Sequence, residues 1–571
     1  TARLFFPGFE GLTMPHSYLR LLLLPLLIFP LALSAAENVA AENVAPVWER
    51  YDESADLAEL AEHENESMHF KRLNSRLLDK NDLWAPFAEQ LQGFSAADYA
   101  RLKPLIVDKS IASMQQAVAD GSLTYEALVT FYIYRIREIE SDNKLFINAI
   151  ISLNPEAINR ARMLDGLRQQ GNAVNLDSMF GIPVLLKDNI GFQGLPTTAG
   201  AVALQNNYAG NAFIVDQLLA KGAIILGKAN LSEWAYFFCE DCPSGYSAMG
   251  GQTLNPYGRK LFGTGGSSSG SGASVAANLA TVAVGSETSG SILSPASANS
   301  LVGLKPTTGT LSRTGVVPIS AVLDTTGALT RSVADAVSLF NAMIGYDQAD
   351  TAMPLISEDF SLIYRELDLE GKRLGVLDNY VDNEFYRRAV SLLTENGATA
   401  ISLDFTASSS ERFLEFLGAE MLRDLALYLQ QYASHEVAIT SIADLQAFNA
   451  VDIDLRAPYG QGLVDRMTQL ELSASELELL REELQTAATI QLQQLFSEAD
   501  LDVLLSIDNR DAGLAALANY PALTIPMGYE ESGRPIGLTL IAPSFQEQDL
   551  IDVGARFEQL SQSRRIPGLY Q

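Results

Sequence analysis

Two glycine- and serine-rich stretches decide the fold of this chain: GGSSSGSG at residues 265–272 and GSETSGSI at residues 285–292. The spacing between them predicts a helix at residues 271–279, about 13 Å long, and a returning strand at residues 280–284, about 16 Å long. A helix and a returning strand of similar length bring both stretches to the same edge of a sheet. The sequence therefore predicts an α/β fold.

Short apolar runs on either side of these stretches predict the other strands of the sheet. Residues 182–186 and 223–226 precede the stretches, and residues 503–507, 523–525 and 537–541 follow them. Continuous apolar runs bounded by Gly and Ser are typical of strands that are buried on both faces, as in parallel sheets. We therefore expect one largely parallel sheet that is closed by both ends of the chain.

A candidate base follows the first of these strands. Lys187 comes directly after residues 182–186, which places it at the carboxyl edge of the sheet, where open α/β sheets bind ligands. A serine nucleophile needs a base, and His63, His69 and His435 all lie in segments that do not look like a site. A lysine can serve when it is neutral, and burial behind an apolar strand lowers its pKa in that direction.

Together with the strand that ends at Lys187, three motifs resemble the amidase signature family: residues 265–272, residues 285–292 and GLKPT at residues 303–307. The resemblance extends over roughly residues 105–350, and it continues in the last strands of the chain. Several spaced motifs in the right order make it highly specific. It implies a Ser-Ser-Lys amide hydrolase on a single large α/β/α sandwich, with a mixed, largely parallel central sheet covered by helices. It implies no metal and no cofactor.

The resemblance also implies a role for each site residue. Ser291 is expected to be the nucleophile that forms the acyl-enzyme, and Lys187 the base that acts through Ser267. Ser267 is the bridging serine, in a cis peptide with Gly266. The backbone amides expected to form the oxyanion hole and bind substrate are those of Thr288, Ser289, Gly290 and Ser291.

Residues 227–235 and 251–253 are most similar to the peptide amidase branch, whose members hydrolyse the C-terminal carboxamide of peptides. Two features depart from the family. Leu293 stands where many members have an arginine, which leaves open how the acidic residue Glu287 is satisfied. Ser289 stands where Gly or Asp is common, and this affects the expected substrate preference more than catalysis.

The resemblance leads us to expect an amidase that releases ammonia from C-terminal amides of peptides or from N-acyl amino acids. The alternatives are a general aliphatic, aryl or fatty acid amide hydrolase on the same fold, or a non-catalytic binder of amides or peptides. The binder would require the loss of the lysine or a serine, and Lys187, Ser267 and Ser291 are all present.

Three other motifs have competing interpretations. Residues 266–270 fit a G-x-S-x-G nucleophile elbow, which would make Ser268 the nucleophile and His435 its base. Residues 222–229 nearly match a phosphate-binding loop but place Ala where Ser or Thr is required, so the lysine before it, Lys228, is interpreted as an ordinary strand-end residue. The motif CEDC at residues 239–242 holds both cysteines of the chain, either as a local disulfide or as two free thiols.

The charge of the chain excludes some partners. The sequence has 39 basic and 69 acidic residues and a formal net charge of −30. Nucleic acids and anionic membranes require clustered Lys and Arg. This disfavours both partners, and with them the amidotransferase subunit of the same family that acts on charged tRNA. We expect a small-molecule or short-peptide amide as partner. The sequence indicates no oligomeric state.

The first residues have the layout of a secretory signal peptide. Translation is expected to start at Met14, and an apolar run at residues 21–33 is followed by small residues. We interpret residues 1–34 as upstream sequence plus signal peptide, residues 35–46 as a linker and residues 47–571 as the amidase domain. The mature protein is expected to be exported, periplasmic or secreted, without a membrane anchor.

Helix signals complete the expected organisation. A helix is predicted to start after Thr124, a residue type favoured at helix N-termini. Residues 408–500 are acidic and helical in pattern and are interpreted as an insert in the amidase domain. Within this insert, Ser475 and Glu478 have the spacing of a capping box.

Overall fold

The computed structural model describes residues 47–571 apart from 171–174, 176–177, 354–359 and 408–409. The expected start, signal peptide and linker at residues 1–46 lie outside the described residues. The strands are β1 Ile150–Leu153, β2 Pro183–Lys187, β3 Ile224–Ala229, β4 Tyr246–Ser247, β5 Gly251–Gln252, β6 Val282–Glu287, β7 Val302–Lys305, β8 Thr325–Thr330, β9 Arg373–Leu377, β10 Thr399–Leu403, β11 Val503–Ile507, β12 Ala522–Tyr529 and β13 Pro535–Ile541.

The helices fall in three groups. Those before β6 are α1 Ser54–Ala61, α2 Asn81–Trp84, α3 Ala88–Gln92, α4 Ala96–Ile106, α5 Ile111–Ala119, α6 Tyr125–Ser141, α7 Ala157–Gln169, α8 Phe213–Ala220 and α9 Ser269–Ala276. Those from β6 to the insert are α10 Leu293–Ala298, α11 Val333–Met343 and α12 Glu384–Glu395. The insert and the C-terminal part contain α13 Phe413–Gln431, α14 Ile442–Ala450, α15 Ile453–Arg456, α16 Gly462–Met467, α17 Ala474–Ala499, α18 Ala512–Leu517 and α19 Glu547–Ser561.

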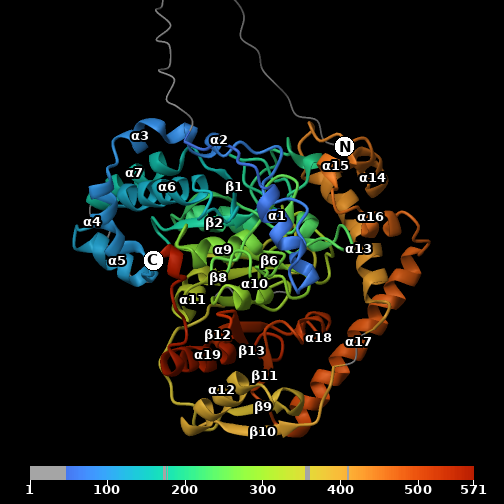
Figure 1. Ribbon diagram of the computed structural model, residues 1–571. Helices are drawn as coiled ribbons and strands as arrows, with labels where there is room; N and C mark the ends of the chain where they lie inside the picture. Colours follow the sequence, from blue (N-terminus) through green and yellow to red (C-terminus); the bar gives the residue numbers. More distant parts are fainter. Residues whose placement is uncertain (1–46, 171–174, 176–177, 354–359, 408–409) are drawn as a thin grey trace, which may run out of the picture. The chain divides into compact units, whose positions relative to one another are not determined.

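One sheet of 11 strands runs through the described part of the chain in the order β1-β3-β2-β6-β8-β7-β12-β13-β11-β9-β10 (Figure 1). It is mixed, as expected, but the expectation that it is largely parallel is wrong. Among the described residues, four strand pairings are parallel and six are antiparallel. Continuous apolar runs indicate burial on both faces and say nothing about direction. β12 and β13, for example, are joined by a short turn, which requires antiparallel pairing.

Helices cover both faces of this sheet. The side chains of Leu523 and Ile525 in β12 meet Gly554 of α19, whereas Thr524 between them shares the opposite face with Ser297 of α10. Successive side chains of a strand point to opposite faces, so α10 and α19 lie on opposite sides. The expected α/β/α sandwich is therefore confirmed.

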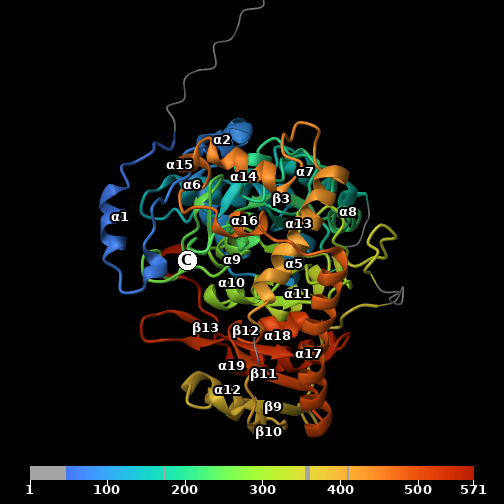
Figure 2. The same ribbon diagram turned by 90° about the vertical axis from the view of Figure 1, so that its right-hand side faces the viewer.

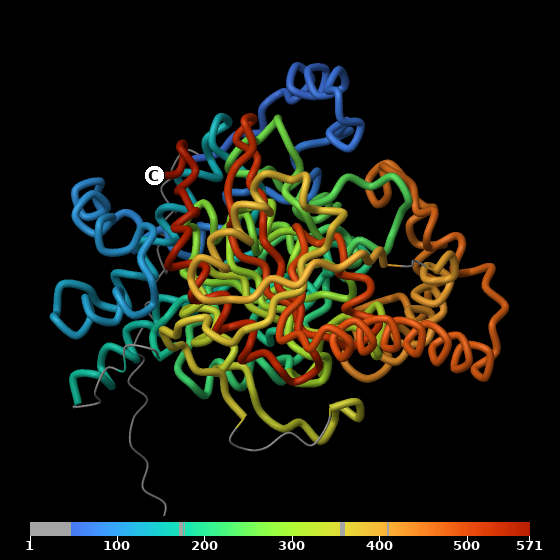
Figure 3. Tube along the Cα trace, turned by 90° about the horizontal axis from the view of Figure 1, so that it is seen from below, coloured from blue at the N-terminus to red at the C-terminus, as the bar shows by residue number. Residues whose placement is uncertain are grey.

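The insert forms a further layer outside the sandwich. In the view that faces it, α13, α14 and α16 lie in front of α9 and α10 (Figure 2). The insert helices lie on the side of the sheet away from α4 and α5 (Figures 1 and 3). A second apolar cluster joins buried residues of α13, α14, α16 and α17 to loops at the carboxyl edge of β2 and β3; it includes Trp234, Phe238, Val317, Ile319, Leu323, Phe416, Met421 and Leu425.

Candidate active site

Lys187 occupies the last position of β2, where the apolar run from Pro183 to Leu186 has carried it into the core. Its side chain is fully buried. The Nζ atom lies 2.7 Å from Ser267 Oγ, 2.9 Å from the carbonyl oxygen of Ser286 and 2.9 Å from Ser286 Oγ. The structure thus brings together Lys187 and Ser267, which are 80 residues apart in the sequence.

The surroundings of Lys187 favour its neutral form. Burial lowers the pKa of this amine from 10.5 to about 7, and the charges of Asp324 and Glu287 act in the opposite direction. Desolvation dominates because an ammonium loses its hydration in the interior. A substantial fraction of Lys187 is therefore neutral near pH 7 and able to accept a proton.

Ser267 lies directly before α9 and is joined to Gly266 by a cis peptide bond, as expected. It is fully buried. The neighbouring amide of Ser268 donates to the carbonyl of Ser291 at 3.2 Å, which ties the loop before α9 to the loop after β6. Ser291 is 9% exposed and is therefore largely buried. Ser267 and Ser291 are thus at the same edge of the sheet, as the helix and strand lengths predicted.

The loop that contains Ser291 turns at a glycine in the left-handed region. Gly290 has φ +85°, a conformation in which a larger side chain is strained. Among the described residues, the N–H groups of residues 288–291 have no protein acceptor. Such free, neighbouring donors can bind a developing oxyanion. Thr288 is anchored by its hydroxyl, which donates to Asp324 Oδ1 at 2.5 Å.

Glu287, whose partner the sequence left open, is bound by backbone amides through one of its two carboxylate oxygens; within the described residues the other, Oε1, is buried without a hydrogen-bond partner. Its Oε2 accepts from the amides of Ile292 at 2.7 Å and of Leu293 at 3.1 Å. These amides belong to the start of α10, where the helix dipole favours a negative charge. With Leu293 in place of the usual arginine, these two amides bind one carboxylate oxygen of Glu287 and leave the other unbonded among the described residues.

Three residues at the site were not identified from the sequence. Ser286 accepts from Lys187, and its hydroxyl also accepts from Asn189 Nδ2 at 2.9 Å. Asp324 holds Thr288 from the turn before β8. Ser286 stands in the motif at residues 285–292, and Asn189 lies two residues after Lys187, so both could have been suspected from position alone. No local sequence pattern identifies Asp324 as a site residue, because its partner Thr288 is 36 residues away in the chain.

Two interpretations of other motifs are corrected. Ser268 is fully buried, and its hydroxyl donates to the carbonyl of Ser286 at 3.0 Å, whereas His435 is exposed on the insert. The nucleophile elbow is therefore wrong. Lys228 is not an ordinary strand-end lysine, because it is fully buried and forms an ion pair with Asp188 at 3.1 Å.

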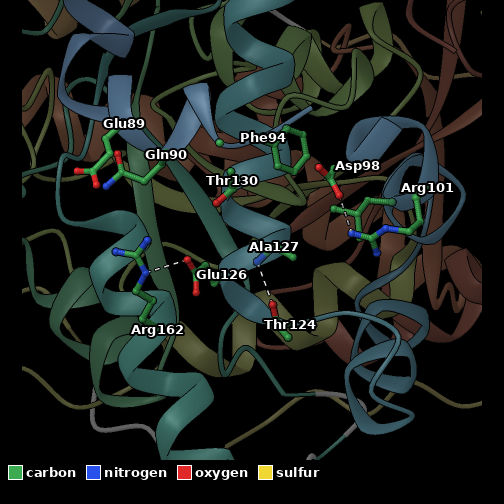
Figure 4. A pocket seen from close by; sticks show the side chains of 12 residues that line it. Glu89, Gln90, Phe94, Asp98, Arg101, Thr124, Glu126, Ala127, Thr130 and Arg162 are labelled. Carbon is green, nitrogen blue, oxygen red and sulfur yellow. Dashed lines mark hydrogen bonds and ion pairs between the residues drawn. The ribbon is translucent and has the colours of Figure 1, made fainter. Parts of the chain in front are cut away.

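Other features lie away from this site. Cys239 and Cys242 form a disulfide. No group of three or more His, Cys, Asp or Glu side chains within the described ranges is arranged to hold a metal. The described part of the chain also contains no helix long and apolar enough to cross a membrane. A pocket of about 480 Å³ is lined by residues of the N-terminal helices, including the ion pair of Glu126 with Arg162 (Figure 4).

Comparison with known proteins gives consistent matches over most of the chain. The profile of the amidase family matches residues 127–509. A probable amidase of Arabidopsis thaliana is 34% identical over 81% of this chain and 92% of its own length. The crystal structure of an amidase family protein from Bacillus anthracis strain Ames is 36% identical, with a TM-score of 0.81, over 87% of this chain and 99% of that one. The peptide amidase from Stenotrophomonas maltophilia is 34% identical, with a TM-score of 0.75, over 81% and 98%.

The chain therefore belongs to the amidase signature family. It is an enzyme that hydrolyses amide C–N bonds. The resemblance noted in the sequence is confirmed.

Proposed function

We propose that this enzyme is an exported amidase that hydrolyses C-terminal carboxamides of peptides or N-acyl amino acids and releases ammonia. In this proposal Ser291 forms the acyl-enzyme, Ser267 relays protons and Lys187 is the base. The observation that carries it is the contact of 2.7 Å between the buried Nζ of Lys187 and Ser267 Oγ.

The first half of the reaction forms the acyl-enzyme. Ser291 Oγ attacks the carbonyl carbon, its proton passes to Ser267, and the proton of Ser267 passes to neutral Lys187. The negative charge on the former carbonyl oxygen is bound by the amides of residues 288–291. When the C–N bond breaks, Lys187 returns the proton through Ser267 to the nitrogen, which leaves as ammonia.

The second half restores the enzyme. Water attacks the ester carbon on Ser291, and its proton follows the same route through Ser267 to Lys187. The ester bond breaks, the proton returns to Ser291 Oγ, and the carboxylic acid is released. The net change is one amide and one water converted to one acid and one ammonia.

Variants of these residues test the relay. We expect Ser291→Ala to abolish ammonia release, and Ser267→Ala and Lys187→Ala each to lower it by orders of magnitude with the fold intact by circular dichroism. Residues that act as one unit lose activity non-additively, so the double variant of Ser267 and Lys187 should be little worse than either single one. Wild-type kcat/KM in Lys187→Ala would refute the relay. Loss of ammonia release on these substitutions would also exclude a non-catalytic amide binder.

The proposed substrate class is supported by the similarity to the solved peptide amidase and by residues 227–235. We expect an N-protected dipeptide amide to be a better substrate than a simple aliphatic, aryl or fatty acid amide. The measurement compares kcat/KM for ammonia release from both. A preference of tenfold or more for the simple amide, about 1.4 kcal/mol, would replace the peptide substrate with the general amide hydrolase.

Export is supported by the signal-like pattern before residue 35 and by the disulfide of Cys239 with Cys242, because disulfides persist in oxidising compartments. We expect the mature protein to begin between Ala35 and Glu37. N-terminal sequencing of protein from a periplasmic or culture fraction tests this. A chain in that fraction that still starts at Met14 would contradict signal cleavage.

A further inference from the structure

Asp324 joins two loops at the candidate active site. Its side chain lies just before β8 and is buried, with 8% of the residue exposed. One carboxylate oxygen accepts from Thr288 Oγ1 at 2.5 Å. The other oxygen accepts from the amides of Ile319 and Ser320 at 2.8 and 3.0 Å. The carboxylate therefore ties the oxyanion loop, residues 288–291, to the turn at residues 319–324.

The helical insert holds the same turn from the other side. Ser320 Oγ donates to Glu420 Oε2 at 3.0 Å, and the amide of Ala321 donates to Asp424 Oδ2 at 2.6 Å. Glu420 and Asp424 lie four residues apart on α13 and so share one face of the helix. Their side chains are 0% and 5% exposed. The bond of Ser320 with Glu420 is therefore buried, whereas the bond of Ala321 with Asp424 is partly buried.

Arg423 keeps this pair of carboxylates together. It lies 2.8 Å from Glu420 Oε2 and 2.6 Å from Asp424 Oδ1. Around the pair, the second apolar cluster packs α13 against residues of the turn, including Ile319 and Leu323. Arg423 itself is 41% exposed, so α13 is held on the turn by the two hydrogen bonds of Glu420 and Asp424 together with this apolar packing.

We propose that Asp324 is a positioning residue for the oxyanion loop, and that the insert sets the rate of the reaction by holding Asp324 through Glu420 and Asp424. This inference rests on the proposed function, because it assigns the 288–291 amides to the oxyanion. Neither Glu420 nor Asp424 touches substrate in this scheme. The insert, whose role the sequence did not indicate, becomes the outer support of the active site.

The position of this loop matters because N–H donors stabilise the oxyanion only when they already point to the place where its charge develops. Removing one such donor lowers kcat by about 100- to 1000-fold, and a displaced donor loses part of this. Thr288 contributes one of the expected N–H donors, and its side chain has a single anchor, Asp324. A loosened anchor should lower kcat and leave KM nearly unchanged, because the oxyanion exists only in the transition state.

Asp324 also has an electrostatic effect that a purely structural residue would lack. Its charge raises the pKa of Lys187, in the same direction as Glu287. Burial raises the pKa of Asp324 itself to about 6, and the charge of Arg313 acts against this. Because a charged Asp324 raises the pKa of Lys187, replacing it by Asn should lower the pKa of Lys187. Other charged groups adjoin the turn. Arg313 donates to the carbonyl of Ala321 and pairs with Asp350, and α13 contributes Glu420, Arg423 and Asp424.

The experiment uses the full enzyme and an amide that the wild type hydrolyses. Thr288→Val removes the anchor, Asp324→Asn removes the charge, and the double variant Glu420→Gln with Asp424→Asn loosens the insert. The matched control is Glu415→Gln, which changes a carboxylate of α13 that pairs with Arg412 at the surface. We expect kcat to fall about tenfold or more in the first three and to stay at the wild-type value in the control.

The pH profile separates the positioning of the oxyanion loop from the effect of the Asp324 charge on the pKa of Lys187. In Asp324→Asn the acid limb of kcat/KM should move to lower pH, whereas in the Glu420 and Asp424 double variant it should stay in place. The inference is overturned if Thr288→Val and the double variant both keep the wild-type kcat. It is also overturned if the acid limb of kcat/KM in Asp324→Asn stays at the wild-type pH. Should the double variant not fold, Ser320→Ala tests the same contact from the turn. A wild type that releases ammonia from no amide overturns the proposed function and this inference together, whereas an active wild type with unaffected variants overturns the inference alone.

Discussion

At Lys187, the proposed base, burial changes the protonation of an ordinary side chain. A lysine in water is an ammonium at neutral pH and has no lone pair to accept a proton. At the end of β2 the same group has no contact with solvent, and its three hydrogen-bonding partners, Ser267 Oγ and both oxygens of Ser286, are neutral. The neutral amine is therefore accessible without a neighbouring histidine.

The first prediction follows from this pKa. In the proposed relay Lys187 acts when it is neutral, and its neutral fraction rises as the pH rises through about 7. We therefore expect kcat/KM to increase with pH through that value and to level off above it. A pH–rate profile of the wild type from about pH 5 to pH 9 measures the limb.

Lys187→Arg is the control for this prediction. It keeps the positive charge but cannot be deprotonated in a protein, so it should be as inactive as Lys187→Ala. Activity that declines from acid toward neutral pH, or an active arginine variant, would contradict the assignment of the base.

At the scale of elements, the turn after β6 depends on Gly290. Its φ is +85°, and a Cβ added there would lie 2.8 Å from Asn509 Nδ2. We expect Gly290→Ala to displace the oxyanion loop and lower kcat strongly. The free energy of unfolding should fall by no more than about 1–3 kcal/mol, which is the cost of the backbone strain. Steady-state kinetics and calorimetry on the same preparation measure both.

Gly533 provides a matched control for Gly290. It has φ +86° in the turn between β12 and β13, and an added Cβ meets nothing within 4 Å. Gly533→Ala therefore carries the backbone strain without the contact and without the active-site loop, and it should keep wild-type kcat. If Gly290→Ala kept the same kcat as Gly533→Ala, the oxyanion loop would not depend on the conformation of Gly290.

The start of α17 shows where local pattern was ambiguous. The expected capping box of Ser475 and Glu478 is wrong, and the observed box is formed by Ser473 and Glu476 two residues earlier. Both pairs have the same spacing. The earlier pair forms the box because Ser473 has the extended backbone of an N-cap residue, with φ −68° and ψ 160°, whereas Ser475 already lies inside the helix. At α6 no competing pair exists, and the Thr124 cap is confirmed.

This gives a stability prediction. Ser473→Ala removes the acceptor for the amide of Glu476 and should lower the free energy of unfolding by about 1 kcal/mol. Ser475→Ala, at an exposed helical position, should leave it unchanged. Urea denaturation of both variants measures the difference. A larger loss of stability in Ser475→Ala than in Ser473→Ala would instead support the capping box of Ser475 and Glu478.

At the scale of the whole molecule, the insert and the core meet around the disulfide loop. Cys239 belongs to the second apolar cluster, and Glu240 forms an ion pair with Arg466 of α16. Replacing both cysteines by serine should lower the free energy of unfolding by about 2 kcal/mol, because the closed loop is very short. The expected loss of kcat is small, since no atom of the loop belongs to the relay.

Calorimetry and thiol titration test this prediction. The protein from an oxidising compartment should contain no reactive thiol, and the double serine variant should unfold at a lower temperature. Two titratable thiols in the native protein would contradict the disulfide, and an unchanged unfolding temperature would show that the loop does not stabilise the insert.

The sequence by itself determined the class of fold and the residues of the proposed catalytic site. Strand ends and glycine-rich turns are local patterns, and helix and strand lengths were enough to place Ser267 and Ser291 at one edge. Only the tertiary structure decided the strand directions, because an apolar run records burial and not orientation. It alone also revealed the partners of Glu287, the buried pair of Lys228 with Asp188 and the support of Thr288 by Asp324. These contacts join residues whose positions along the chain carry no common pattern, and packing brings them together.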